Sequence, residues 1–250
     1  SIITISKATK GEIIPVFVKF NNSNNNINRL ISGSFSFNNV SQNISLDTIY
    51  AKMGKASILT KIIADNSFVL SIAGFDGQKY IEVVDEIPQE VLQGEIADNI
   101  TLNNDKDYLI LSDLYINEDV SLSIEEGTRI FIAEKVNVFV NGEIISNGTE
   151  SNPVLFAPID YDKPWGGIVV LNTNNNKTSE FTYTFFGGGG DNENYIFGHS
   201  ESQAVLKAEN ANMSFNNCYF MDNPGKALGS YNSRVDIIDS YITRSDMGGE

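Results

Sequence analysis

Short runs of alternating apolar and polar residues recur along the whole chain, and they predict an all-β protein. In the first third these runs lie at residues 13–20, 30–37, 44–49, 58–63, 68–73 and 79–84. Turn-forming clusters separate them, such as the Asn-rich loop at 21–26. About seven short strands at this spacing favour a small antiparallel β-sandwich, Ig-like in a loose sense, over residues 1–86.

Helical periodicity is almost absent from the chain. The best helical segment is 88–94, Pro-Gln-Glu-Val-Leu-Gln-Gly, which could equally be a connection. We therefore expect a linker over residues 87–106.

The pattern changes from about residue 107. Strict alternation over runs of three to five residues, as at 120–124 and 136–140, is interrupted by corner-forming Gly and Asn, as at 141–142. Very short strands with such corners are typical of a parallel β-helix, in which each coil has two or three short sides. We assign residues 107–250 to this fold.

An internal repeat supports that assignment. Residues 213–220 align with 235–242 at an offset of 22, and 181–186 align with 215–220 at an offset of 34. One such unit cannot bury its own apolar face, so it must stack on its neighbours. The longer offset indicates about 12 extra residues, which we expect to form a loop outside the solenoid that includes residues 191–194. Insertions on a repeat scaffold often carry function.

Residues 121–130, 138–149, 153–156 and 165–168 together resemble the opening coils of secreted right-handed parallel β-helix proteins. These belong to the pectin-lyase-like superfamily and are common in bacteria of the Bacteroidetes type. The resemblance implies an extracellular or cell-surface location. It implies no particular catalytic residue, because the superfamily includes lyases, hydrolases and adhesins. The chain ends directly after a repeat strand, so we expect a β-helix truncated at its C-terminus.

The net charge and the composition of the chain limit the classes of binding partner that it can have. There are 17 Lys and Arg against 32 Asp and Glu, a net charge of −15, which disfavours nucleic acid. No apolar run is long enough for membrane insertion as a helix. The single cysteine, Cys218, excludes an intrachain disulfide, and the repeat places it opposite Ser240 as a small packed residue. A polysaccharide or cell-surface glycan is the expected partner, and the oligomeric state stays open.

The 22-residue repeat also brings charged residues together. Asp222 should lie over Arg244, and Pro224 over Asp246, one strand spacing apart. Asp222, Arg244 and Asp246 are therefore the candidate catalytic residues, for acid–base chemistry or metal binding. The alternative is a surface ion pair at a coil corner.

Three residues are candidates for ligand binding. Tyr161 and Trp165 could form an aromatic platform for a sugar ring, or Trp165 could cap the core beside Gly166 and Gly167. His199, the only histidine, could be a catalytic acid or a ligand-binding residue, or a polar residue at a loop junction.

The acidic residues Asp191 and Glu193 could bind Ca²⁺, although they lack the spacing of a known calcium loop. The alternative is that the protein needs no cofactor.

Three functions follow. The leading one is a non-catalytic extracellular module of a larger secreted or surface protein, for adhesion or glycan contact. The second is a polysaccharide lyase or glycoside hydrolase acting on acidic or plant or algal polysaccharide. The third is a structural spacer without a ligand. Converging carboxylates would favour the enzyme, and an exposed aromatic or polar ladder would favour the binding module.

Overall fold

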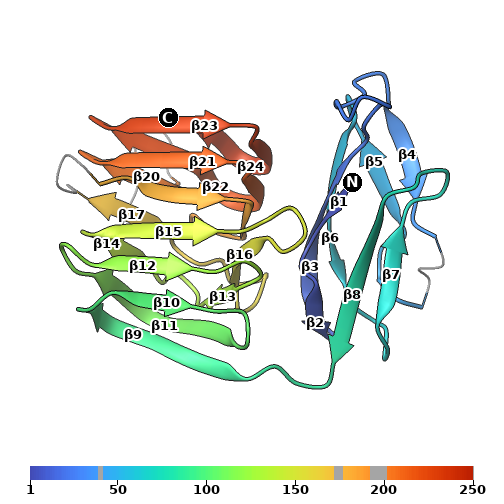
Figure 1. Ribbon diagram of the computed structural model, residues 1–250. Coiled ribbons are helices and arrows are strands. Elements are labelled where there is room, and N and C mark those ends of the chain that lie inside the picture. The colour runs from blue at the N-terminus through green and yellow to red at the C-terminus, as the bar shows by residue number, and fades with distance from the viewer. Residues whose placement is uncertain (39–41, 172–176, 192–201, 250) are drawn as a thin grey trace. The chain divides into compact units, whose positions relative to one another are not determined.

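The computed structural model describes residues 1–38, 42–171, 177–191 and 202–249. The chain divides into two compact units, one of Ser1–Ile87 with Glu150–Asn152, the other of Pro88–Thr149 with Pro153–Glu250 (Figure 1). We refer to them as unit 1 and unit 2. No helix within the described ranges is long and apolar enough to cross a membrane.

Unit 1 is built from short strands, as its alternating pattern predicts. Its described strands are β1 (Ile2–Ile3), β2 (Lys7–Thr9), β3 (Ile13–Lys19), β4 (Gly33–Ser36), β5 (Thr48–Ala51), β6 (Lys55–Lys61), β7 (Phe68–Ser71) and β8 (Gln78–Val84). They form the sheets β1-β3-β6, β2-β8-β7 and β4-β5. The pair β2–β8 is parallel, which a purely antiparallel sandwich would not contain. The Ig-like arrangement stays a prediction.

The linker expected at 87–106 is wrong, and residues 88–94 form neither of the two alternatives given for them, a helix or a connection. The segment contains β9 (Gln89–Ile96) and β10 (Ile100–Leu102). These strands pair in parallel with β11 (Asp107–Ile116) and β12 (Ser121–Ile124) and form the first coil of unit 2. The chain turns within β9 at Gly94, where φ is +72°, between the buried residues Leu92 and Ile96.

Unit 2 is a stack of parallel coils, seen in Figure 1 from green to red. Its remaining strands are β13 (Arg129–Ile132), β14 (Val138–Val140), β15 (Glu143–Asn147), β16 (Val154–Pro158), β17 (Ile168–Leu171), β18 (Ser179–Thr182), β19 (Thr184–Gly187), β20 (Ala204–Glu209), β21 (Asn212–Asn216), β22 (Tyr219–Tyr231), β23 (Arg234–Ile238) and β24 (Tyr241–Gly249).

These strands line the sides of the solenoid. One side is the separate sheet β10-β12-β15-β18-β21-β23. The others are the runs β13-β16-β19-β22 and β20-β17-β14-β11-β9, which the long strands β11 and β22 join into one sheet. The first part of β11 pairs with β13 and its last part with β14, so this strand continues around a corner. The parallel β-helix predicted from residue 107 is therefore present, and it begins one coil earlier.

Strand pairing confirms both offsets of the repeat. Met213 pairs with Val235 and Tyr219 with Tyr241, which is the 22-residue offset. Phe181 pairs with Phe215, which is the 34-residue offset. The predicted insertion at 191–194 lies, beyond Asp191, outside the described residues.

Aromatic ladders fill the interior of unit 2. Phe186 stacks between Phe156 and Phe220, with ring centroids 5.4 and 4.9 Å apart. Phe181 and Phe215 form a second stacked pair at 5.2 Å. All five rings are buried, and such pairs add about 0.5–1.5 kcal/mol each beyond the burial of their area. The rings stack because the repeat places like residues one strand spacing apart.

Left-handed residues mark the corners of the coils. Asn217 and Asp239 occupy equivalent positions and have φ of 54° and 46°. Asn210 and Asn232, also 22 residues apart, have φ of 52° and 47°, and Asn232 Nδ2 donates to Asn210 Oδ1 at 2.7 Å. Asn and Asp tolerate this region better than other non-glycine residues, which explains their use at the corners.

Candidate functional site

The structure confirms the predicted stacking of Asp222 and Arg244. Arg244 donates from both Nε and Nη2 to the Asp222 carboxylate, with the Nη2–Oδ2 distance at 2.7 Å. Both residues are corner residues with positive φ, 55° and 51°. The hydrogen bonds to Asp222 raise the pKa of Arg244 most. Burial lowers it by a smaller amount, and the negative charge of Asp222 adds a further, still smaller increase. An arginine held in its protonated form is unsuited to the role of catalytic base.

Asp246 occupies a different setting. The strand register shifts between Asn223, which pairs with Ser245, and Lys226, which pairs with Met247. Asp246 lies at this irregularity, so the predicted position opposite Pro224 is not part of a regular ladder. Its carboxylate accepts a hydrogen bond from Ser202 Oγ at 3.0 Å. Together with the Arg244 pKa, this favours a structural ion pair at the corner over an acid–base group of three residues.

For Trp165 the structure agrees with the cap on the core and not with the aromatic platform. Its side chain has no accessible surface, and Nε1 donates to the carbonyl of Gly187 at 2.8 Å. The indole fills the space at the glycine-rich corner and presents no face to a sugar. Tyr161 is partly buried and lies close to Gly187.

The remaining predicted ligands are not brought together by the described structure. His199 and Glu193 lie outside the described residues, and Asp191 is partly buried. No group of three or more His, Cys, Asp or Glu side chains that could hold a metal ion is found among residues 1–38, 42–171, 177–191 and 202–249. The Ca²⁺ site stays a prediction.

A polar face lies on the outside of the sheet β10-β12-β15-β18-β21-β23. Its inward residues, such as Leu122, Ile144 and Phe215, are buried in the core. The alternate positions form rows that run across the strands. One row, followed through the pairing register, contains Thr101, Ser123, Ile145, Glu180, Ser214 and Asp236. A neighbouring row contains Asn147, Thr182 and Asn216 and ends at the exposed Ile238.

A shallow hollow of 310 Å³ opens on this face. Its wall carries hydroxyl, amide, carboxylate and guanidinium groups from β18, β21 and β23 and from Thr178, the residue before β18. The six residues are Thr178, Glu180, Asn212, Ser214, Arg234 and Asp236. Arg234 Nε donates to Asp236 Oδ2 at 2.9 Å, which fixes the cation beside the carboxylate. We call these six residues the β18–β23 hollow.

Sequence reasoning missed this hollow, although a signal for it exists. Glu180, Ser214 and Asp236 are separated by the same offsets, 34 and 22, that align their strands. Reading the outward positions of the repeat, as well as the apolar ones, would have aligned them.

Comparison with known proteins agrees with the fold of unit 2. Residues 94–197 match the family model described as a pectate-lyase like beta helix domain. Together with the parallel sheets, this supports the pectin-lyase-like superfamily for the β-helix. The search of curated proteins gave no match, and neither did the search of solved structures.

Proposed function

We propose that this protein is a non-catalytic extracellular or cell-surface module that contacts glycans through the polar face of its β-helix. The observation that carries the proposal is the β18–β23 hollow, with the polar rows that continue from it. The extracellular location rests on the resemblance to secreted β-helix proteins.

The chemistry of the face suits a sugar polymer. Hydroxyl, amide and carboxylate groups are the polar groups that fix the orientation of a bound small molecule. Neighbouring strands are about 4.8 Å apart, so similar groups recur at that interval across the face. A polymer lying across the strands would meet a series of similar contacts. Each would be weak, and their effects on binding would combine.

The charge of unit 2 favours a neutral glycan. Its residues, 88–149 and 153–250, include 24 Asp and Glu against nine Lys and Arg, a net charge of −15. Such a surface repels polyanions at low salt. We therefore place neutral polysaccharides such as xylan or mannan ahead of pectate and alginate.

Binding to an array of neutral and acidic polysaccharides tests the proposal, with and without Ca²⁺. Asn212→Ala and Arg234→Ala should each weaken retention of the bound polysaccharide about tenfold, the effect of losing roughly 1.4 kcal/mol of binding. Lys106→Ala is a matched control, because it removes a charged side chain paired with Glu90 on β9 of the same unit. Equal binding by all the variants would contradict the proposal.

A second candidate is hydrolysis of a glycan in the same hollow. Glu180 and Asp236 lie in one outward row with Ser214 between them, so their backbones are about 9.6 Å apart, two strand spacings. Inverting glycosidases place their two carboxyl groups roughly 6.5–9.5 Å apart. Release of reducing ends that is lost in both Glu180→Gln and Asp236→Asn would favour this function. No binding and no turnover on any glycan would favour the structural spacer.

A further inference from the structure

Unit 1 has a hollow of its own, of 330 Å³, at the end of β3. Its wall includes Lys19 and Phe20, Asn21 and Asn25 from the loop that follows, and Phe75 and Asp76 from the β7–β8 turn. All of these residues belong to unit 1, so the hollow is defined within one compact body. Its volume lies at the lower end of the range for small-ligand sites, about 300–1,000 Å³.

Phe75 gives this hollow a fixed aromatic wall. Its ring meets Phe20 and Phe35 in edge-type contacts, with centroids 4.7 and 5.6 Å apart. Although packed on two rings, Phe75 is 37% exposed. An exposed ring held by two other rings presents an apolar surface at little cost in side-chain entropy.

Two residues that line the same hollow, Asn21 and Asp76, carry acceptor oxygens without hydrogen-bond partners among the described residues. Asn21 Nδ2 donates to Asn25 Oδ1 at 2.9 Å, whereas Asn21 Oδ1 is buried without a hydrogen-bond partner in the described part of the chain. A buried acceptor in this state costs about 1–3 kcal/mol, so a donor that reaches it would stabilise the site. The Asp76 carboxylate also forms no hydrogen bond or ion pair with a described residue.

We propose that this hollow binds a single pyranose residue, such as the end of a glycan chain. A sugar ring has an apolar face that can pack on Phe75. Its hydroxyl groups can donate hydrogen bonds to Asn21 Oδ1 and to the Asp76 carboxylate, two acceptors that have no donor among the described residues. This site is separate from the polar face of unit 2, and each can exist without the other.

Saturation-transfer NMR on the full chain tests the site, with methyl glycosides of glucose, galactose, mannose, xylose and N-acetylglucosamine as probes. At least one should show ring-proton contacts, and Phe75→Ala and Asn21→Ala should each reduce its affinity about tenfold or more. Asn21→Ala is needed as well because Phe75→Ala also removes ring packing from the core. Thermal unfolding of each variant checks that it is folded.

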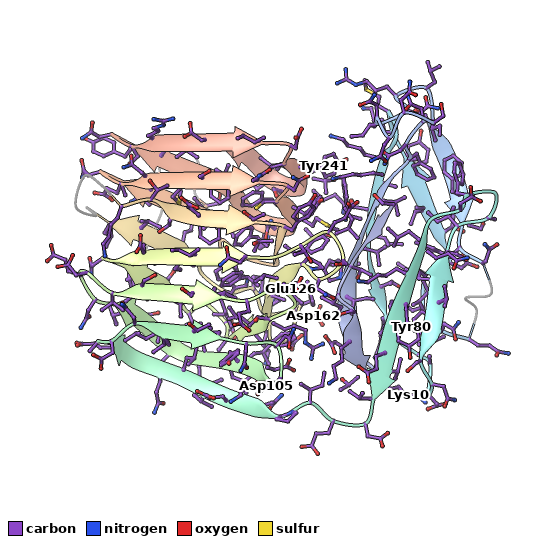
Figure 2. All side chains as sticks on the ribbon, in the orientation of Figure 1. Lys10, Tyr80, Asp105, Glu126, Asp162 and Tyr241 are labelled. Carbon is purple, nitrogen blue, oxygen red and sulfur yellow. The ribbon has the colours of Figure 1, made fainter. Side chains whose placement is uncertain are left out.

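Tyr80→Ala is the control, because Tyr80 is an exposed ring on β8, 57% accessible (Figure 2). It should leave the signal unchanged. Absence of contacts with every glycoside, or contacts that survive both Phe75→Ala and Asn21→Ala, would overturn the proposal and leave water as the partner of Asn21. Variants of the β18–β23 hollow should have no effect on these signals, so this site and the proposed function fail independently.

Discussion

Asp107 and Arg129, 22 residues apart on adjacent coils, form a two-point ion pair in the buried part of unit 2. Arg129 Nε donates to Asp107 Oδ1 at 2.8 Å, and Nη2 donates to Oδ2 at 2.7 Å. Both side chains are less than one tenth exposed. The guanidinium also lies 5.5 Å from the centre of the Phe131 ring. A buried ion pair therefore joins adjacent coils near the start of unit 2, whereas stacked Phe side chains join the later coils.

Removing one partner of this pair should be costly. Asp107→Ala leaves the guanidinium buried without its carboxylate, and we expect a loss of about 3–5 kcal/mol in the free energy of unfolding measured with urea. Lys106→Ala breaks the more exposed pair with Glu90 and should cost less than about 1 kcal/mol. Similar losses in the two variants would show that the buried pair has no special role.

The buried thiol should make stability depend on alkaline pH. Burial raises the pKa of Cys218 to about 12, and Sγ donates to the Phe181 carbonyl at 3.2 Å. Because the folded pKa lies above the unfolded value of about 8.5, the contribution is complete below that value and is lost as pH rises toward the folded pKa. Between about pH 9 and 11, Cys218→Ala should show a shallower fall in unfolding free energy than wild type. Parallel curves would contradict this account.

Because the Cys218 thiol is buried, we also expect it to react slowly with thiol reagents. Only the thiolate reacts readily, and Cys218 has no accessible surface. A disulfide reagent at pH 8 should therefore label the protein in urea and leave the folded chain almost unlabelled. Rapid labelling without urea would show that the coil opens locally.

Substitutions at Asn217 test whether this coil corner has the left-handed backbone conformation. Asn217 has a φ of 54°, so Asn217→Gly should be nearly neutral, whereas Asn217→Val should destabilise by about 1–2 kcal/mol or more. Asn216→Val, one position earlier on the exposed side of β21, is the control and should be tolerated, since valine suits a strand. Thermal unfolding of the three variants gives the comparison. Equal effects at both positions would argue against a left-handed corner.

The repeat could be predicted from the sequence because residues of similar character, apolar or aromatic, recur at offsets of 22 and 34 and stack on adjacent coils. The offset that aligned Met213 with Val235 also placed Asp222 over Arg244, as the structure shows. The first coil was missed because the corner at Gly94 breaks the alternation of β9.

The site was harder to predict than the fold. The sequence around Trp165 left two roles open, a sugar platform and a cap on the core beside Gly166 and Gly167, and the structure buries the ring completely. The hollow at Phe75 depends on contacts between Phe20, Phe35 and Phe75, which are far apart in the sequence. Such convergence is set by tertiary packing rather than by any local pattern.

Hydrogen–deuterium exchange with and without a bound polysaccharide tests the central claim most directly. The probe is whichever neutral polysaccharide the array retains. The account predicts slower exchange in 178–182, 212–216 and 234–238, which carry the β18–β23 hollow, and little change in β14 and β17 on another side of the solenoid. Protection confined to β14 and β17, or no protection in unit 2, would contradict glycan contact through the polar face.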